Sequence, residues 1–239
     1  MKLPSFRTRL KRFVRRMIGD PEVLLEEYED GPGLFHQYRK LIETGHQRAA
    51  GGWTWQGRFY PDHLTVGGAC FGAFQAAKSW CRGTGIDVGA GAWPYPGSKP
   101  IDPMWYPDGL KLDDVDAGSQ DYVFTSHTLE HIADWRGAVR GLWSKLRPGG
   151  VLFIYLPHPD CGLWRMENPF MREYHKWVPD PDTVKLAVRS LGAEIVDTND
   201  GPDVMMSFFV CARKPAPAAT GHFPHSGRSD IPENLLAAV

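Results

Sequence analysis

The sequence predicts an α/β fold, in which a mostly parallel β-sheet carries helices on both faces. From about residue 71, short apolar segments alternate with amphipathic ones, which is the pattern of βαβ units. The apolar segment 85–88 runs into a glycine-rich turn, as strands of open α/β sheets do where they bind ligands. The 239 residues, of which 42% are hydrophobic, suffice for one domain with a packed core.

The first half of the sheet comes from three predicted strands. We expect a helix at about 71–82 and then a strand at 85–88. A second, short strand ends near Ile101, and a buried strand covers 121–126. The next helix has the clearest pattern, because Asp134 is placed to cap it and its apolar residues share one face (Trp135, Val139, Leu142, Trp143 and Leu146).

The second half begins at residues 147–150, where Arg-Pro-Gly-Gly ends that helix and turns into a strand at 151–156. A loop rich in Pro, His and Trp covers 157–179. Asp180 and Pro181 then open a helix that Gly192 closes. Two strands complete the sheet, at about 193–198 and 204–212.

The chain divides into three predicted parts. Residues 1–70 form a helical extension and lid, 71–213 the α/β domain, and 214–239 a flexible tail rich in Pro, Ala and Gly. Within the extension, helices are expected at about 5–18, 21–29 and 34–43. The remainder, 45–70, is rich in Gly and aromatic residues, which predicts a loop or lid that faces the substrate.

Four tryptophans have two interpretations. Trp53 and Trp55 lie in the predicted lid, and Trp164 and Trp177 in the loop at 157–179. Each either stacks on a sugar or ring of the substrate or packs in the core.

The charge is distributed unevenly along the chain. It has 27 basic and 28 acidic residues, a formal net charge of −1, yet residues 1–19 hold seven basic side chains and no acid. The rest carries 20 basic and 28 acidic residues, a net charge of −8. A nucleic-acid-binding protein spreads positive charge over its folded body, so we expect no nucleic acid as partner.

The basic residues belong to the amphipathic helix predicted at residues 5–18. Its apolar stripe either lies on an anionic membrane surface, where each basic residue contributes about 1 kcal/mol, or packs on its own domain. No segment approaches the roughly 20 apolar residues of a membrane span, and no secretory signal is visible. We therefore expect a cytoplasmic protein, peripheral on the inner face of the membrane under the first alternative.

No metal site is expected from the sequence. The cysteines lie far apart, without a CxxC pair or zinc-finger spacing, and no tight acidic or histidine cluster is visible. We expect reduced core or pocket residues at all four positions (Cys70, Cys81, Cys161 and Cys211). Glu130 and His131 are expected to form a structural pair.

The main chemical signal is the segment 85–93, Gly-Ile-Asp-Val-Gly-Ala-Gly-Ala-Trp. Its glycines let the backbone approach a ligand at the carboxyl end of a strand. The third glycine of the dinucleotide fingerprint is missing, and Trp93 and Pro94 stand where a phosphate-binding helix begins, which disfavours NAD or FAD. A ligand without a phosphate fits better.

Two further motifs follow this segment. Residues 126–131 read Ser-His-Thr-Leu-Glu-His, and residues 146–150 read Leu-Arg-Pro-Gly-Gly. Together with D-x-G-x-G at 87–91, they resemble the motifs of the Rossmann-like S-adenosylmethionine-dependent methyltransferases. The resemblance implies a three-layer sandwich with an antiparallel last strand and S-adenosylmethionine as cofactor.

The resemblance also implies cofactor contacts, position by position. Asp102 would bind the ribose hydroxyls, Leu112 and Asp113 the adenine, and Ser126 and His127 would lie near the sulfonium. The methionine part would be lined by Asp87, Gly89, Ala90 and Gly91. Only ten residues separate Gly91 from Asp102, so a short turn replaces the helix that most relatives have there.

Methyl transfer from a sulfonium needs an acceptor held in line and, for a hydroxyl acceptor, a base. Four residues are candidates for catalysis. His127 either acts as the base or shapes the cofactor pocket. His158 and Asp160 follow the fifth strand, at the edge where substrates bind, and His175 is either an acceptor contact or a surface histidine.

The sequence does not identify the molecule that accepts the methyl group. The first hypothesis is a sugar, O-methylated in surface-polysaccharide or glycolipid synthesis, because the segments 96–102 and 156–160 resemble methyltransferases of that setting. A membrane-attracted N-terminus would suit a lipid-linked acceptor. The alternatives are a small aromatic or other metabolite as acceptor, and a non-catalytic module that binds a partner through its basic helix.

Overall fold

The computed structural model describes residues 36–65 and 69–216. The helices expected at 5–18 and 21–29, and the tail beyond 216, lie outside these residues. No helix in the described part of the chain is long and apolar enough to cross a membrane.

Six strands form the large sheet, in the order β5-β4-β6-β7-β9-β8. β5, β4, β6 and β7 are parallel neighbours, whereas β9 runs antiparallel to both β7 and β8. The predicted mostly parallel sheet with an antiparallel last strand is therefore confirmed. The strands are β4 Gly85–Val88, β5 Lys99–Ile101, β6 Gln120–Ser126, β7 Leu146–Pro157, β8 Glu194–Asn199 and β9 Ser207–Arg213.

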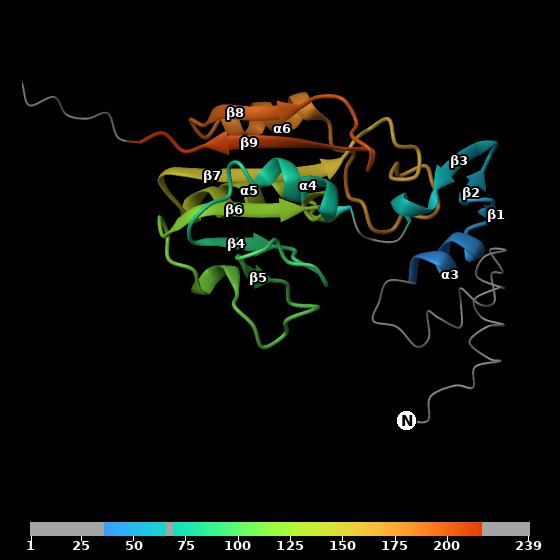
Figure 1. Ribbon diagram of the computed structural model, residues 1–239, viewed down its shortest axis with the longest axis horizontal. Coiled ribbons are helices and arrows are strands. Elements are labelled where there is room, and N and C mark those ends of the chain that lie inside the picture. Colours follow the sequence, from blue (N-terminus) through green and yellow to red (C-terminus); the bar gives the residue numbers. More distant parts are fainter. Residues whose placement is uncertain (1–35, 66–68, 217–239) are drawn as a thin grey trace, which may run out of the picture.

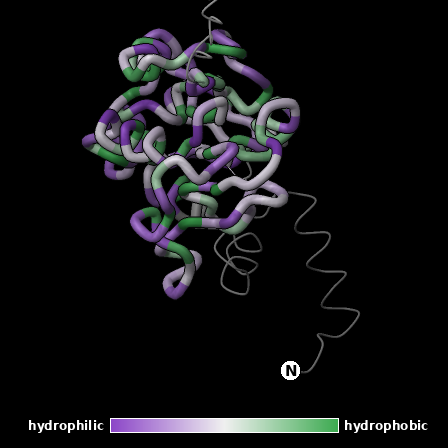
Figure 2. Tube along the Cα trace, turned by 90° about the vertical axis from the view of Figure 1, so that its left-hand side faces the viewer, coloured by the Kyte–Doolittle hydropathy of each residue, from purple (hydrophilic) through white to green (hydrophobic). Residues whose placement is uncertain are grey.

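Helices cover both faces of this sheet, which gives three layers (Figure 1). α4 (Cys70–Ala77) packs on one face, and α5 (Trp135–Lys145) and α6 (Pro181–Arg189) pack on the other. Side chains alternate between the faces of a strand, so Val123 packs with α5 and α6 while its neighbour Phe124 packs with α4. Many outer loops of the domain are hydrophilic (Figure 2). The three-layer sandwich is thus confirmed.

The boundaries of two elements differ most from the prediction. α4 ends at Ala77, before the expected end near residue 82. β7 begins at Leu146 rather than 151, because Leu146 already pairs with Gln120 of β6 before the turn at Gly149 and Gly150. The predicted cap is in place, since the Asp134 side chain accepts a hydrogen bond at the start of α5.

Residues 45–70 were expected to form a loop or lid, and the expectation of a loop is wrong. They contain a three-stranded antiparallel sheet and a short 3-10 helix, comprising β1 Gln47–Ala49, β2 Gly52–Trp55, β3 Arg58–Pro61 and η1 Asp62–Leu64. The turn between β2 and β3 has positive φ at both Gln56 and Gly57, which is typical of a two-residue hairpin. The glycines therefore mark turns between strands, and Trp53 is fully buried in the core.

The small sheet lies at the end of the molecule toward which β4, β6 and β7 point (Figure 1). Its Trp53 and Tyr60 form one apolar cluster with Leu41 of α3 (His36–Glu43) and with Leu163 and Phe170 of the loop after β7. The small sheet and this loop are thereby held together at the carboxyl edge, where open α/β sheets bind their ligands.

Candidate functional site

The turn after β4 brings the backbone into close contact with the end of β6. Gly89 has φ of 78°, and a Cβ at this position would overlap the Thr128 side chain. Its N–H donates to the Ile101 carbonyl of β5 at 2.8 Å. Gly91 also has positive φ and has open space where a Cβ would stand. Residues 89–98 form turns without a helix, as the short spacing to Asp102 predicted.

Asp87, at the end of β4, is a buried carboxylate with one unused oxygen. The side chain is 2% exposed, and its Oδ2 accepts a hydrogen bond from the Tyr95 N–H at 2.7 Å. The other oxygen, Oδ1, is buried and has no partner among the described residues. Burial raises the pKa of Asp87 to about 7; nearby Asp102 adds to the rise, and the Tyr95 hydrogen bond opposes it. A donor or cation from a ligand would satisfy the free oxygen.

Asp102 connects the turn after β4 with the turn after β5. Its Oδ2 accepts from the Gly91 N–H at 3.0 Å, and its Oδ1 accepts from the N–H groups of Met104 and Trp105. Each carboxylate oxygen has two lone pairs, so one lone pair, on Oδ2, remains for a ligand hydroxyl. Of the two predicted adenine contacts, Asp113 is exposed. Leu112 packs against the main core cluster.

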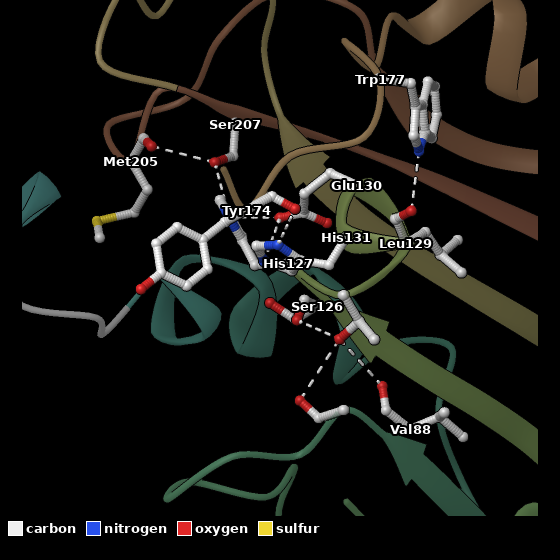
Figure 3. A network of polar contacts seen from close by, with 12 residues as sticks. Val88, Ser126, His127, Leu129, Glu130, His131, Tyr174, Trp177, Met205 and Ser207 are labelled. Carbon is white, nitrogen blue, oxygen red and sulfur yellow. Dashed lines mark hydrogen bonds and ion pairs between the residues drawn. The ribbon is translucent and has the colours of Figure 1, made fainter. Parts of the chain in front are cut away.

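The end of β6 presents a second unused polar atom. The Oγ of Ser126 is buried and has no partner among the described residues. His127 follows with positive φ of 47°, a conformation that is strained for a non-glycine residue. Thr128 donates to the Ser126 carbonyl at 3.0 Å and contacts the Val88 carbonyl, which ties this turn to the end of β4 (Figure 3).

Both ring nitrogens of His127 face polar groups (Figure 3). Nε2 lies 2.9 Å from Ser207 Oγ, which itself donates to the Met205 carbonyl. A carbonyl can only accept, so the Ser207 hydroxyl accepts from His127, and Nε2 carries the proton. Nδ1 lies 3.3 Å from Glu130 Oε1. The ring also packs edge-on against Trp164, with centroids 5.9 Å apart.

The other candidate catalytic residues differ in how many of their lone pairs are free to accept a proton. His158 is occupied on both sides, because its Nδ1 accepts from the Asp160 N–H and its Nε2 contacts the Asp200 carbonyl, each at 3.1 Å. The side chain of Asp160 is 68% exposed, and its Oδ2 lies 3.7 Å from His158 Nδ1. His175 is only 2% exposed, so the surface interpretation is wrong. Of the four candidates, Asp160 has the most accessible lone pairs.

The remaining tryptophans separate into two roles. Trp177 stacks on Trp135 at 4.2 Å and donates its ring N–H to the Leu129 carbonyl at 2.8 Å, so it packs within the domain. Trp55 is half-buried and stacks on His46. Trp164 is 9% exposed and contacts His127 at the carboxyl edge, which leaves it as the predicted stacking residue nearest the β6 turn.

Several polar contacts of the site were not predicted. Ser207 holds His127 but comes from β9, and no local pattern marks it. Thr128 fills the space above Gly89, which its place inside the Ser-His-Thr-Leu-Glu-His motif could have indicated. Glu130 and His175 approach each other from distant parts of the chain, and sequence spacing carries no sign of this contact.

One family model matches the chain. A family model described as a methyltransferase domain matches residues 73–198, which is more than half of the chain. No curated protein sequence matches the chain.

The chain is similar at low identity to solved methyltransferase structures. An S-adenosylmethionine-dependent methyltransferase of Thermotoga maritima is 15% identical, with a TM-score of 0.48, and the match covers 59% of this chain and 87% of that one. A methyltransferase of Mesorhizobium loti is 17% identical, with a TM-score of 0.46, and the match covers 62% of this chain and 99% of that one. A methyltransferase of Archaeoglobus fulgidus is 16% identical, with a TM-score of 0.45, and the match covers 60% of this chain and 92% of that one.

The residues at the carboxyl edge suit the cofactor of this family. S-adenosylmethionine carries an ammonium group, a sulfonium and two ribose hydroxyls. Asp87 offers a free buried carboxylate oxygen, Ser126 a free buried hydroxyl, and Gly91 an open backbone position beside Asp102. Together with the matched family model, this identifies the chain as a member of the Rossmann-like S-adenosylmethionine-dependent methyltransferases.

Proposed function

We propose that this methyltransferase O-methylates a sugar hydroxyl, as part of surface-polysaccharide or glycolipid synthesis. The observation that carries the proposal is Asp160, an accessible carboxylate directly after β7 at the carboxyl edge. A hydroxyl acceptor must lose a proton, whereas a tertiary amine has none to lose. Trp164, in the same loop, contributes the edge of a largely buried ring beside His127, and a combination of aromatic and polar groups is suited to carbohydrate.

The cofactor is proposed to lie across the ends of β4 and β6. Asp87 would bind the ammonium group, Asp102 the ribose hydroxyls and Leu112 with Asp113 the adenine, while Gly89, Ala90 and Gly91 keep the approach open. Ser126 and His127 would face the reacting centre. S-adenosylmethionine, when bound, supplies a methyl group activated by a sulfonium sulfur.

Asp160 is proposed to accept the proton of the acceptor hydroxyl. With a bound donor, the acceptor oxygen would take the methyl group while sulfur keeps the electron pair of the carbon–sulfur bond, so only the hydroxyl proton would remain for the chain to remove. A hydroxyl oxygen becomes strongly acidic as it takes the methyl group, so an ordinary carboxylate suffices to take the proton late in the step. His158 holds the backbone of Asp160 through the 3.1 Å hydrogen bond to Nδ1 and thereby positions the carboxylate.

The acceptor is tested with a labelled methyl donor and two panels of compounds, simple glycosides and small phenols. We expect label in glycosides. Asp160→Asn should lower kcat by about 100-fold and leave cofactor affinity unchanged, since general-base catalysis contributes roughly 10²- to 10⁴-fold. Asp116→Asn is the control, because Asp116 is likewise exposed. Label in phenols alone would favour the metabolite alternative, and full activity of Asp160→Asn would exclude it as the base.

The membrane association of residues 5–18 remains part of this proposal. A lipid-linked sugar acceptor would be presented at the inner membrane face, where a basic amphipathic helix binds anionic lipid. Sedimentation with anionic vesicles tests it: a chain lacking residues 1–19 should stay in the supernatant while the full chain pellets. Equal sedimentation of both forms would leave only packing on the domain.

A further inference from the structure

Glu130 is a fully buried carboxylate that faces His127 Nδ1 at 3.3 Å. It lies in η3 (Leu129–His131), directly after β6, and its side chain is 0% exposed. Burying an ionised carboxylate is unfavourable by several kcal/mol unless cations or donors surround it. Three imidazole rings do surround it, from His127, His131 and His175.

His131 directs a nitrogen lone pair toward this carboxylate. Its Nδ1 lies 3.2 Å from the Tyr174 carbonyl, which can only accept, so Nδ1 carries the proton. In the neutral ring Nε2 is then unprotonated, and it lies 3.8 Å from Glu130 Oε1. A lone pair and a carboxylate oxygen that face each other at this distance can share a cation. The ring is 39% exposed, which gives access from solvent.

His175 contributes a second free nitrogen from the loop after β7. Its ring hydrogen-bonds to the backbone of Trp164, while Nδ1 is buried and has no partner in the described part of the chain. The rings of His131 and His175 lie 5.0 Å apart.

We propose that Glu130, His131 and His175 bind a divalent transition-metal ion of the zinc class. Their donor atoms all lie within 4.8 Å of one another. Ligands at about 2 Å from zinc are at most about 4 Å apart, so side-chain shifts of about 1 Å complete the site. Two imidazoles and a carboxylate suit zinc, cobalt or iron, whereas magnesium and calcium prefer oxygen ligands. The sequence predicted no such cluster.

The surroundings already have the form of a metal site. Metal-binding histidines usually donate their other ring N–H to a carbonyl or carboxylate, and His131 does so to Tyr174. The loop and η3 are also joined without an ion, because the Lys176 N–H donates to the Glu130 carbonyl at 2.7 Å. An ion would fasten the loop after β7 to the end of β6. It would therefore lie beside the proposed acceptor loop, but its binding does not depend on the acceptor.

Calorimetry on the full chain, stripped with a chelator, tests the site with Zn²⁺ and Co²⁺, and with Mg²⁺ as the ion that should not bind. We expect one Zn²⁺ per chain, visible Co²⁺ absorption bands and a Tm that rises with Zn²⁺ concentration. His131→Ala and the size-conserving His175→Gln should each weaken binding at least about tenfold. His63→Ala is the matched control, since His63 is exposed and also contacts a carbonyl, that of Val204.

Two results would overturn the site. One is a wild-type chain that binds neither Zn²⁺ nor Co²⁺, which would leave Glu130 as the structural counter-ion of His127. The other is unchanged binding in His131→Ala and His175→Gln, which would place the ion on other histidines. Neither measurement uses cofactor or acceptor, so a wrong acceptor in the proposed function leaves both readouts intact.

Discussion

Asp87 and Glu130 are buried carboxylates that follow neighbouring strands, yet their pKa values shift in opposite directions. Asp87 ends β4 with a single backbone donor, and burial raises its pKa to about 7. Glu130 follows β6, where burial would also raise its pKa, but the hydrogen bond and charge of His127, with smaller effects of His131 and His175, more than offset this and lower it. The two carboxyl groups differ in surroundings rather than in exposure.

This difference shows which of the two carboxylates is suited to bind a positively charged ligand. A carboxyl whose pKa is raised lacks positive neighbours, so a cationic ligand gains most by binding beside it. Glu130 already has imidazole neighbours, and its negative charge is held whether or not a ligand is present. Asp87 is therefore suited to bind a ligand that carries a positive charge. Glu130 instead pairs with the histidines of the fold or with a metal ion.

Asp87→Asn should have the largest effect on ligand binding. It keeps the size of the side chain but removes the negative charge proposed to pair with the cofactor ammonium group. A hydrogen bond to a charged group contributes up to about 3 kcal/mol, so the affinity for S-adenosylhomocysteine should fall roughly 50-fold in calorimetry. The melting temperature without ligand should hold or rise, because the buried charge is gone. An unchanged affinity would show that the pocket lies elsewhere.

Glu130→Gln should instead destabilise the chain itself. The amide removes the negative charge that the contact with His127 stabilises, and a buried unsatisfied polar group destabilises by about 2 kcal/mol. Urea unfolding in chelator, without cofactor, measures the loss. Glu167→Gln is the control, because Glu167 is exposed. If both variants unfold at the same urea concentration, the histidines do not hold the charge of Glu130.

The sequence predicted the α/β sheet because its signals are local. Gly85 to Val88 is a short apolar run before glycines, and Asp134 caps a helix whose apolar residues share one face. The small sheet was missed because its strands are only three or four residues long, too short for a period to show. Its glycines were read as a loop, although they make the turns of hairpins.

In the candidate site, too, local motifs were predicted and long-range contacts were not. Asp87, Gly89 and Gly91 stand in one short motif, so their meeting at the carboxyl edge follows from the strand that carries them. His175 packs beside Glu130 only through the course of the loop after β7, which is fixed by its contacts with η3 and the small sheet. Such a contact depends on tertiary packing and leaves no trace in local spacing.

Ligand affinity should depend on pH through Asp87. With a pKa near 7, the free carboxyl is mostly protonated at pH 6 and half ionised at pH 7. The ionised form pairs with the cofactor ammonium group, which stays protonated below about pH 7.7. The affinity for S-adenosylhomocysteine should therefore rise about fivefold from pH 6 to 7. Asp87→Asn should show a flat profile, and a rise that persists in this variant would come from another group.

Asp113→Asn should have the smallest effect on cofactor affinity, because Asp113 is exposed on η2 (Leu112–Asp114) and water already solvates it. Replacing one exposed acceptor by another should lower the affinity for S-adenosylhomocysteine by about twofold, without a change in the pH profile. Calorimetry on Asp87→Asn, Asp113→Asn and the double variant checks this, since distant and independent contacts give additive effects. A loss at Asp113 as large as that at Asp87 would mean that burial does not rank the carboxylates of this site.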